Sequence, residues 1–241
     1  MHAPPFVLFG SAHLWTIALT FLFPLVLATI VRASGGEGAR RAMRWFFAAE
    51  LIATWILWYW LIWQRGWISL QTVAPMWLCD WATIAALITL IRPNQYSYEA
   101  AYFWAFSGTL QALLTPELFY DFPDLRFIVF FAFHGGVIAA VLYLTFGCRM
   151  RPYPSSIPRV LAWSLLYLAS AGVVDWLFGT NFGYLRAKPG AASAIDYLGP
   201  WPWYIGGLAA LAVVYVLVLY APFWIADRIT GPSPVRQFGD A

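Results

Sequence analysis

The sequence predicts an all-α polytopic membrane protein, a bundle of seven transmembrane helices with the N-terminus outside and the C-terminus in the cytoplasm. Composition is the first observation behind this prediction, since the 241 residues are 62% hydrophobic and 20% aromatic but only 10% charged. The mean hydropathy is +0.68, whereas about a quarter of the residues in ordinary soluble domains are charged. The chain is therefore expected to lie in lipid.

The same composition argues against several other classes of protein. Two cysteines cannot form a disulfide scaffold, and the high apolar content is incompatible with intrinsic disorder or a collagen-like fibre. No nucleic acid is expected as a partner, because the net charge is only +3 and no run of basic residues alternates with aromatic ones.

Apolar windows are the second observation. A helix needs about 20 mostly apolar residues to cross a hydrocarbon core of about 30 Å. Windows near that length, bounded by charges, proline or glycine, cover residues 14–31, 45–63, 73–91, 98–114, 127–146, 160–178 and 202–225. The stretch before the first window lacks the basic segment of a signal peptide, so we expect it to be retained.

The distribution of basic residues between alternate loops is the third observation, and it predicts the orientation. One side of the membrane would carry Arg65, Arg126, Arg186 and Lys188. The other side would carry the rest of the 14 Lys and Arg residues, namely Arg32, Arg40, Arg41, Arg44, Arg92, Arg149, Arg151, Arg159, Arg228 and Arg236. Because the side richer in Lys and Arg stays in the cytoplasm, the N-terminus is expected outside.

The domain organisation is expected to be simple. No internal repeat or linker is visible, so residues 1–241 would form a single seven-helix transmembrane domain. The longest segment between windows is an outer loop at about residues 179–201, whose aromatic and charged residues indicate an ordered cap. Tryptophan and tyrosine clusters at the ends of the second and seventh windows are typical of the headgroup belt.

Polar residues inside the apolar windows are the candidates for function, because a charge deep in the bilayer costs at least about 2.5–3.5 kcal/mol on insertion scales. Glu50 and Glu99 lie near the cytoplasmic ends of their windows, and interhelical hydrogen bonding or snorkelling is the simpler interpretation for both. The others converge on the outer third. At 1.5 Å per residue, Cys79 and His134 both lie about 9–10 Å from the outer ends of their windows.

Further polar residues belong to the same outer layer. Gln111 and Asp175 lie about 5 Å below the outer ends of their helices, His13 precedes the first window, and Asp80 follows Cys79. The outer loop could close over this layer with four polar side chains, Asn181, Tyr184, Arg186 and Lys188. This convergence predicts an outward-opening polar pocket.

Cys79 and His134 are the candidates for catalysis. A cysteine thiolate attacks ester carbonyls, and a histidine at the same depth can accept the thiol proton. A membrane cysteine is also often a small apolar filler, and the glycines that follow His134 are explained equally well by close helix packing. Asp80 is 100° away from Cys79 around the helix and is expected to orient His134 or another polar partner.

Other uses of these residues are less well supported. Cys148 would lie about 21 Å from His134 along one helix, so no disulfide with Cys79 is expected. His13, His134, Asp80, Asp175 and Cys79 are possible zinc ligands, but they lack the spacing of a metal site, so no metal is expected. Retinal is excluded because Lys188, the only lysine, lies in the outer loop, and no cofactor is expected.

Several motifs resemble the bacterial YwaF-type integral membrane proteins, and the likeness covers almost the whole chain. They are residues 78–80 (LCD), 101–104 (AYFW), 108–116 (GTLQALLTP), 133–136 (FHGG), 179–189 (GTNFGYLRAKP) and 198–204 (LGPWPWY). On these motifs the chain is identified as a member of that family, and the resemblance implies a multi-pass protein of the bacterial inner (cytoplasmic) membrane.

The family is similar to a eukaryotic transmembrane phospholipid acyltransferase and, more distantly, to androgen-induced hydrolases of fatty-acid esters. The resemblance implies Cys79 as nucleophile and His134 as general base. Asp80 differs from the residue that follows the cysteine in the eukaryotic pattern.

Two functional hypotheses follow. In the first, the chain is a lipid acyltransferase or lipid-ester hydrolase that forms a thioester on Cys79. Gln111 would stabilise the oxyanion, and Arg186 with Lys188 would hold the phosphate of a phospholipid or lysophospholipid. In the alternative, a non-enzymatic protein binds or transports a polar solute or lipid headgroup through Asp80, Asp175 and His134. Membrane lipids are the expected partners, and nothing in the sequence indicates an oligomeric state.

Overall fold

The computed structural model describes residues 4–190 and 193–231, and all its named elements within those ranges are helical. Arg236, one of the basic residues that predict the orientation, lies outside the described residues. The elements are α1 (Ser11–Ser34), α2 (Glu37–Arg65), α3 (Leu70–Val73), α4 (Leu78–Ile91), α5 (Gln95–Trp104), a π-helical turn (Ala105–Thr109), α6 (Leu110–Leu114), α7 (Leu125–Phe146), α8 (Ser156–Phe178), two 3₁₀ turns (Phe182–Tyr184 and Ala194–Leu198) and α9 (Trp203–Thr230).

Six spans in the described residues are long and apolar enough to cross a membrane: α1, α2, the α3–α4 segment, α7, α8 and α9. They confirm the predicted helical membrane fold, and they match six of the predicted windows. The window at 98–114 is not among them, because its helix is divided into α5, the π-helical turn and α6. The pieces nevertheless follow one another without a gap from residue 95 to residue 114.

The third predicted window does not form one continuous helix, which corrects its expected start at Val73. α3 ends at Val73, and α4 begins only at Leu78. Pro75 lies in the break, where its ring removes a backbone donor and disfavours a helical conformation at the residue before it. Cys79 is therefore in the first turn of α4 and not two turns inside a helix, as the window implied.

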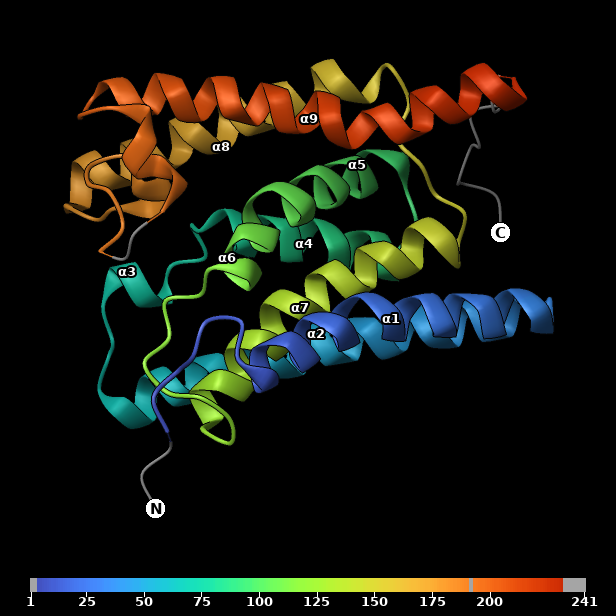
Figure 1. The fold of residues 1–241 in the computed structure, drawn as a ribbon, viewed down its shortest axis with the longest axis horizontal. Helices are drawn as coiled ribbons and strands as arrows, with labels where there is room; N and C mark the ends of the chain where they lie inside the picture. Colours follow the sequence, from blue (N-terminus) through green and yellow to red (C-terminus); the bar gives the residue numbers. More distant parts are fainter. Residues whose placement is uncertain (1–3, 191–192, 232–241) are drawn as a thin grey trace.

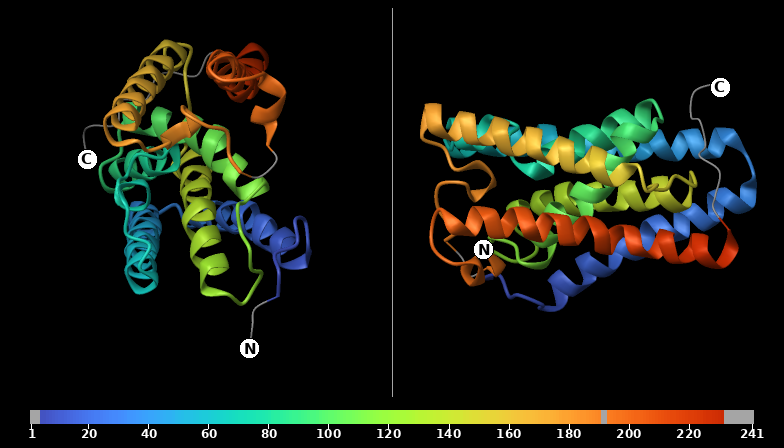
Figure 2. Two further views of the ribbon diagram at one scale, coloured as in Figure 1. Left: turned by 90° about the vertical axis from the view of Figure 1, so that its left-hand side faces the viewer. Right: turned by 90° about the horizontal axis from the view of Figure 1, so that it is seen from above.

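The helices form three layers, and α7 contacts more of the other helices than any other span does. Figure 1 shows α8 and α9 along the top, α4 and α5 in the middle, and α1, α2 and α7 below, and the end view in Figure 2 shows the same separation. α7 packs against α1, α2, α4 and the helical run from residue 95 to residue 114. It is the most buried span, whereas α8 and α9 present mostly exposed apolar side chains, as helices that face lipid do.

Two successive glycines bring α7 into close contact with its neighbours. A Cβ atom built on Gly135 would lie 2.6 Å from Thr20 Oγ1 on α1. A Cβ atom built on Gly136 would lie 2.5 Å from Glu50 Oε2 on α2. Small residues at helix crossings let backbones approach closely in lipid, where dispersion contacts replace the hydrophobic effect. The packing role considered for these glycines in the sequence is therefore confirmed.

Polar contacts connect the layers. Glu99 on α5 is 1% exposed and accepts hydrogen bonds from Arg159 on α8 at 2.8 and 2.6 Å, which confirms the interhelical interpretation of Glu99. Trp104 Nε1 donates to Ser164 Oγ at 2.9 Å, again between α5 and α8. Arg151, before α8, binds Asp227 on α9 through two bonds of 2.7 and 2.6 Å.

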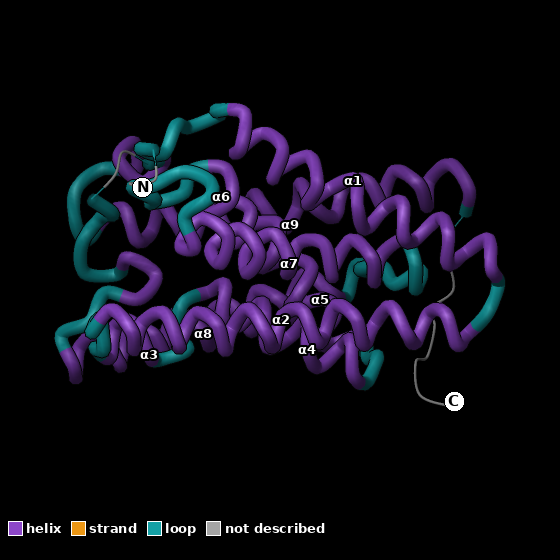
Figure 3. The backbone as a smooth tube through the Cα atoms, turned by 90° about the horizontal axis from the view of Figure 1, so that it is seen from below, coloured by secondary structure: helices purple, strands orange, loops and turns teal. Residues whose placement is uncertain are grey.

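The connections gather at the two ends of the bundle (Figure 3). The α1–α2, α4–α5 and α7–α8 connections and the end of α9 share one end, on the right in Figure 1. At the other end, Asp124 caps α7 by accepting from the Arg126 backbone N–H at 2.9 Å. The side-chain hydrogen bond from Arg126 holds the pKa of this carboxyl below its ordinary value, so the cap stays ionised at neutral pH.

The close contact at Gly135 gives a test of the packing. Gly135→Ala is expected to destabilise the protein by about 1–3 kcal/mol, because the added methyl group overlaps the Thr20 hydroxyl in a filled interior. Adding Thr20→Ala should recover most of this loss, as measured by thermal unfolding in detergent. Gly206→Ala on α9 is the matched control, since nothing lies within 4 Å of its added Cβ atom. Equal melting temperatures for Gly135→Ala and the control would contradict this packing.

Candidate functional site

The amino-terminal turn of α4 is the centre of the candidate site. Asp80 is buried, and its Oδ2 accepts from the Trp77 backbone N–H at 3.0 Å, which completes a capping box at the helix start. The backbone N–H groups of Leu78 and Cys79 donate to no backbone carbonyl or capping side chain among the described residues, and the Leu78 N–H is directed at the Tyr167 hydroxyl. The first N–H groups of a helix carry its positive dipole end. Asp80 thus closes the helix end, and its carboxyl is not directed at His134 by any hydrogen bond in the described structure.

The side chain of Cys79 faces the interior of the bundle. It is half-buried and a free thiol. Thr83 and Ala86, which follow at helical spacing on the same face, are fully buried, whereas Ile88, on the opposite face, is 48% exposed. The thiol and the two unpaired N–H groups therefore share the interior end of α4.

An aromatic lid covers this helix end. The lid is the 3₁₀ turn Phe182–Tyr184 in the outer loop. Trp77, which precedes α4, packs its ring 5.5 Å from the rings of both Phe182 and Tyr184. Tyr184 is also within electrostatic range of Cys79, and burial raises the pKa of its phenol to about 12. The 3₁₀ turn therefore packs on Trp77, the residue that precedes α4.

Asp175 at the end of α8 fixes the lid. It is 1% exposed, and its Oδ1 accepts from Thr180 Oγ1 at 2.7 Å and from the Phe182 backbone N–H at 2.8 Å. Its Oδ2 has no hydrogen-bond partner. Because a hydrogen bond to a charged group contributes about 1.5–3 kcal/mol, this carboxylate is the main polar anchor of the lid.

The other predicted loop residues organise the loop itself. Asn181 Oδ1 accepts from the Arg186 and Ala187 backbone N–H groups at 2.9 and 3.0 Å. The Arg186 guanidinium donates to the Thr180 carbonyl at 3.4 Å. Lys188 Nζ lies 3.9 Å from an Asp196 carboxylate oxygen, so its charge is partly neutralised. Most polar atoms of these residues already have partners within the loop.

One ring nitrogen of His134 is hydrogen-bonded, and the other is not. Its Nδ1 lies 2.9 Å from the Phe130 carbonyl oxygen, and the two rings stack at 4.2 Å. A carbonyl only accepts, so Nδ1 carries the hydrogen and Nε2 carries the lone pair. Nε2 has no hydrogen-bond partner among the described residues. This is the tautomer that a general base requires.

The direction of His134 follows from the glycines after it. Gly135 faces α1 and Gly136 faces α2. At 100° per residue, His134 points about 160° away from the direction of Gly136. The imidazole is therefore turned away from α2.

Contacts of His13 place residues of α6 and α7 at the same depth in the bundle. His13 Nε2 donates to the Leu113 carbonyl at 2.9 Å, and the His13 ring lies 5.3 Å from the Phe131 ring. Leu113 on α6 and Phe131 on α7 therefore lie at nearly one depth. The other His13 nitrogen, Nδ1, accepts from the Phe9 backbone N–H at 3.0 Å, so neither nitrogen of this predicted site residue is left for a ligand.

Cys79 and His134 lie at similar depths below that level. His134 follows Phe131 by three residues on α7, and Gly108 precedes Leu113 by five on the helical run from residue 95 to residue 114. Because the two segments run in opposite directions, both His134 and Gly108 lie deeper in the bundle than the level of Leu113 and Phe131. A Cβ atom on Gly108 would be 2.7 Å from the Leu78 side chain, which places the start of α4 at this depth. At 1.5 Å per residue the offset between Cys79 and His134 is within about one helical turn. No hydrogen bond joins the two side chains in the described structure.

Gln111 is directed elsewhere. Its Nε2 donates to the Tyr215 hydroxyl at 2.6 Å and so connects α6 with α9. This contact is part-buried between the two helices, and no hydrogen bond links Gln111 with Cys79 in the part of the chain that the structure describes. The predicted oxyanion role of Gln111 therefore finds no support in its contacts, and the free N–H groups at the start of α4 are better placed for it.

A protein-family model for the TMEM164 family matches residues 8–220. The chain belongs to the TMEM164 family. This transmembrane family match spans every element from α1 to most of α9 and includes both Cys79 and His134. No curated protein and no solved structure matches the chain. The expected multi-pass membrane protein is thus supported by both the family and the helices, whereas the YwaF-type assignment stays a prediction.

Sequence reasoning missed one polar side chain of this TMEM164 family member. Tyr167 on α8 is buried beside the lid, and its hydroxyl has no hydrogen-bond partner. A tyrosine in the middle of an apolar window was the available signal. Glu50 packs on Gly136 with an unpartnered Oε2, so the expected interhelical hydrogen bond is not made by that oxygen.

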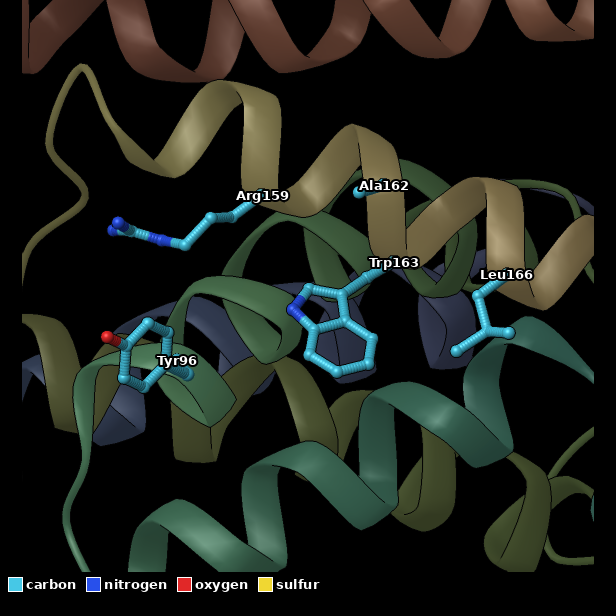
Figure 4. Close-up of a pocket in the computed structure, with 5 residues that line it drawn as sticks. All are labelled: Tyr96, Arg159, Ala162, Trp163 and Leu166. Carbon is cyan, nitrogen blue, oxygen red and sulfur yellow. The ribbon is translucent and has the colours of Figure 1, made fainter.

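Three other features of the structure were candidates for function: the second thiol, metal-binding groups and a surface pocket. Burial raises the pKa of the Cys148 thiol to about 11, so it stays protonated at neutral pH. No three His, Cys, Asp or Glu residues of the described chain gather into a metal-binding group. A pocket of about 360 Å³ lies at the far end of α8 from the lid (Figure 4), lined by Tyr96, Arg159, Ala162, Trp163 and Leu166.

The anchoring role of Asp175 is testable by hydrogen–deuterium exchange in nanodiscs. Asp175→Ala is expected to speed amide exchange at Phe182 by at least about tenfold, because a charge-assisted hydrogen bond is lost. Asp175→Asn, which keeps an acceptor oxygen, should show a smaller change. Exchange at residues 138–144 in α7 serves as the internal control. Unchanged lid protection in Asp175→Ala would show that the lid is held by other contacts.

Proposed function

We propose that this protein is a membrane-embedded lipid acyltransferase or lipid-ester hydrolase in which Cys79 carries the acyl group. The observation that supports the proposal most is the position of Cys79 in the first turn of α4, beside two unpaired backbone N–H groups. A helix amino terminus favours a thiolate, and backbone N–H groups stabilise an oxyanion in the same place.

The first half-reaction transfers the acyl group to the enzyme. His134 Nε2 takes the proton from the Cys79 thiol, and the sulfur attacks the ester carbonyl carbon of a phospholipid. The carbonyl π electrons move to the oxygen, and the N–H groups of Leu78 and Cys79 stabilise the resulting oxyanion by donating hydrogen bonds to it. When the intermediate collapses, the ester C–O bond breaks, the departing alkoxide takes the proton from His134, and a thioester remains on Cys79.

The second half-reaction returns the enzyme to its starting state. A lysolipid hydroxyl, or water, gives its proton to His134 while its oxygen attacks the thioester carbonyl carbon. The C–S bond then breaks, and the Cys79 thiolate recovers the proton. A lysolipid acceptor yields a phospholipid with a new acyl chain, whereas water yields a free fatty acid.

The surroundings of the site fit a lipid substrate. α8 and α9 present exposed apolar faces to the membrane, and the lid lies at the polar end of the same helices. We assign Arg186 and Lys188 to the phosphate group of the substrate. Both lie in the outer loop beside the lid, and their present partners are carbonyl oxygens and a partly exposed carboxylate that a phosphate can replace.

We also propose that the chain crosses the membrane seven times, with the N-terminus outside. The helical run from residue 95 to residue 114 supplies the seventh crossing. At about 1.5 Å per residue its 20 residues are long enough to span the hydrocarbon core. The described arginines Arg32, Arg92 and Arg151 lie in or next to connections at one end of the bundle, as the positive-inside rule requires of a cytoplasmic end. On the family resemblance, the membrane is the bacterial inner membrane.

Substitution of the two central residues tests the acyl-transfer proposal. Purified protein in nanodiscs is supplied with a phospholipid and an isotope-labelled lysolipid, and labelled phospholipid is measured by mass spectrometry. Cys79→Ala is expected to abolish turnover because no thioester can form. His134→Gln should lower the rate by about 10²–10⁴-fold, the usual effect of losing a general base.

Cys148→Ala is the matched control, since it removes the other thiol at a distance from the site, and it should keep full activity. Intact-protein mass spectrometry should detect an acyl adduct on Cys79 that hydroxylamine removes. Full turnover by Cys79→Ala would overturn the proposal. A lipid or solute that co-purifies without turnover or adduct would favour the non-enzymatic alternative.

The proposed orientation is tested by labelling with a membrane-impermeant maleimide in a Cys148→Ala background. Gly190→Cys in the outer loop should react in intact cells, whereas Gly38→Cys at the start of α2 should react only after permeabilisation. Both glycines have open space around an added Cβ atom, so the substitutions should not disturb the fold. The reverse pattern of labelling would mean that the N-terminus faces the cytoplasm.

A further inference from the structure

The hydroxyl of Tyr167 is an unpaired donor inside the bundle. Tyr167 lies on α8 and is 7% exposed, and its oxygen has no hydrogen-bond partner. The hydroxyl of buried Tyr98, by contrast, is paired: it binds Thr145 Oγ1 at 2.8 Å and donates to the Met150 carbonyl at 3.1 Å. Buried polar groups without a partner are uncommon in native proteins and call for a specific reason.

The Tyr167 hydroxyl lies next to the candidate site at the first turn of α4. Its electrostatic neighbours are Cys79, Asp80 and Asp175, and the backbone N–H of Leu78 is directed at the phenol oxygen, which leaves the hydroxyl hydrogen without an acceptor. The Tyr167 ring packs edge-to-face on Trp81, at 5.4 Å, which fixes its direction along α4. The hydroxyl therefore points at the helix end that carries the thiol and the free N–H groups.

The backbone of the lid packs closely over the hydroxyl, whose oxygen is buried. Gly183, the central residue of the lid, has φ of +62°, and a Cβ atom there would lie 3.1 Å from the Tyr167 oxygen. A side chain at this position would be strained by the backbone conformation and would press on the hydroxyl. Glycine thus lets the lid backbone approach the hydroxyl without placing a side chain against it.

We propose that the Tyr167 hydroxyl is a catalytic hydrogen-bond donor to the acyl carbonyl oxygen while that group is attached to Cys79. This proposal rests on the proposed function. When the thiolate adds, the carbonyl oxygen becomes negative, and the O–H of Tyr167 completes an oxyanion site with the N–H groups of Leu78 and Cys79. Tyr167 keeps its proton throughout, so the proton balance of both half-reactions, with His134 as the carrier, is unchanged.

The test is Tyr167→Phe, which removes a single oxygen atom. Its kcat is expected to fall by about 10²–10³-fold, the usual loss for one oxyanion donor. KM should stay within about threefold of the parent value, because the hydrogen bond strengthens only as negative charge develops. The single-turnover rate of adduct formation on Cys79 should fall by the same factor. The melting temperature should be unchanged or higher, since an unpaired buried hydroxyl is removed.

Tyr98→Phe is the matched control. It removes a paired hydroxyl remote from the site, so the melting temperature should fall while kcat per folded molecule is kept. Tyr167→Phe with kcat within twofold of the parent value would overturn the inference, as would a loss of activity that only follows a loss of folded protein. Failure of the proposed function is seen separately, as parent protein without turnover or adduct, and the inference then fails with it.

Discussion

The requirement that backbone donors be satisfied at membrane depth governs the rest of this structure. Pro75 interrupts the third span, and α4 restarts at Leu78 inside the bundle. Such a break is tolerated in lipid only where protein covers it or where it borders a polar cavity. The capping box of Asp80 satisfies one donor, while the N–H groups of Leu78 and Cys79 are left for the interior. The interruption thus creates the polar environment in which Cys79 lies.

The elements around this break act together. The lid covers the helix end with Phe182 and Tyr184, and Asp175 at the end of α8 holds the lid through two charge-assisted hydrogen bonds. The buried carboxylates of Asp80 and Asp175 therefore act in the same way, since each accepts a hydrogen bond from a backbone N–H group at the edge of the site. The proposed mechanism assigns the chemistry to the Cys79 thiol, the Nε2 atom of His134 and the Tyr167 hydroxyl.

α7 supplies the rigid support for the histidine. Gly135 and Gly136 bring the helix against Thr20 and Glu50, so His134 cannot shift without disturbing two other spans. The hydrogen bond to the Phe130 carbonyl fixes the tautomer. Close packing and a fixed proton position are both needed for a general base, because a shift of about 1 Å is sufficient to slow proton transfer. The same contacts explain why α7 is the most buried span of this TMEM164 family member.

The sequence by itself determined the membrane class and the helical fold. These properties follow from apolar length, helical rise and charge distribution, which depend on local sequence. Hydrogen-bond partners were decided by the tertiary structure. It directed Gln111 to Tyr215 and His13 to Leu113, assigned Asp80 and Asp175 to backbone donors, and placed Tyr167 at the thiol. Rotation about helix axes and the break at Pro75 settle these contacts, and both depend on packing between segments far apart in the chain.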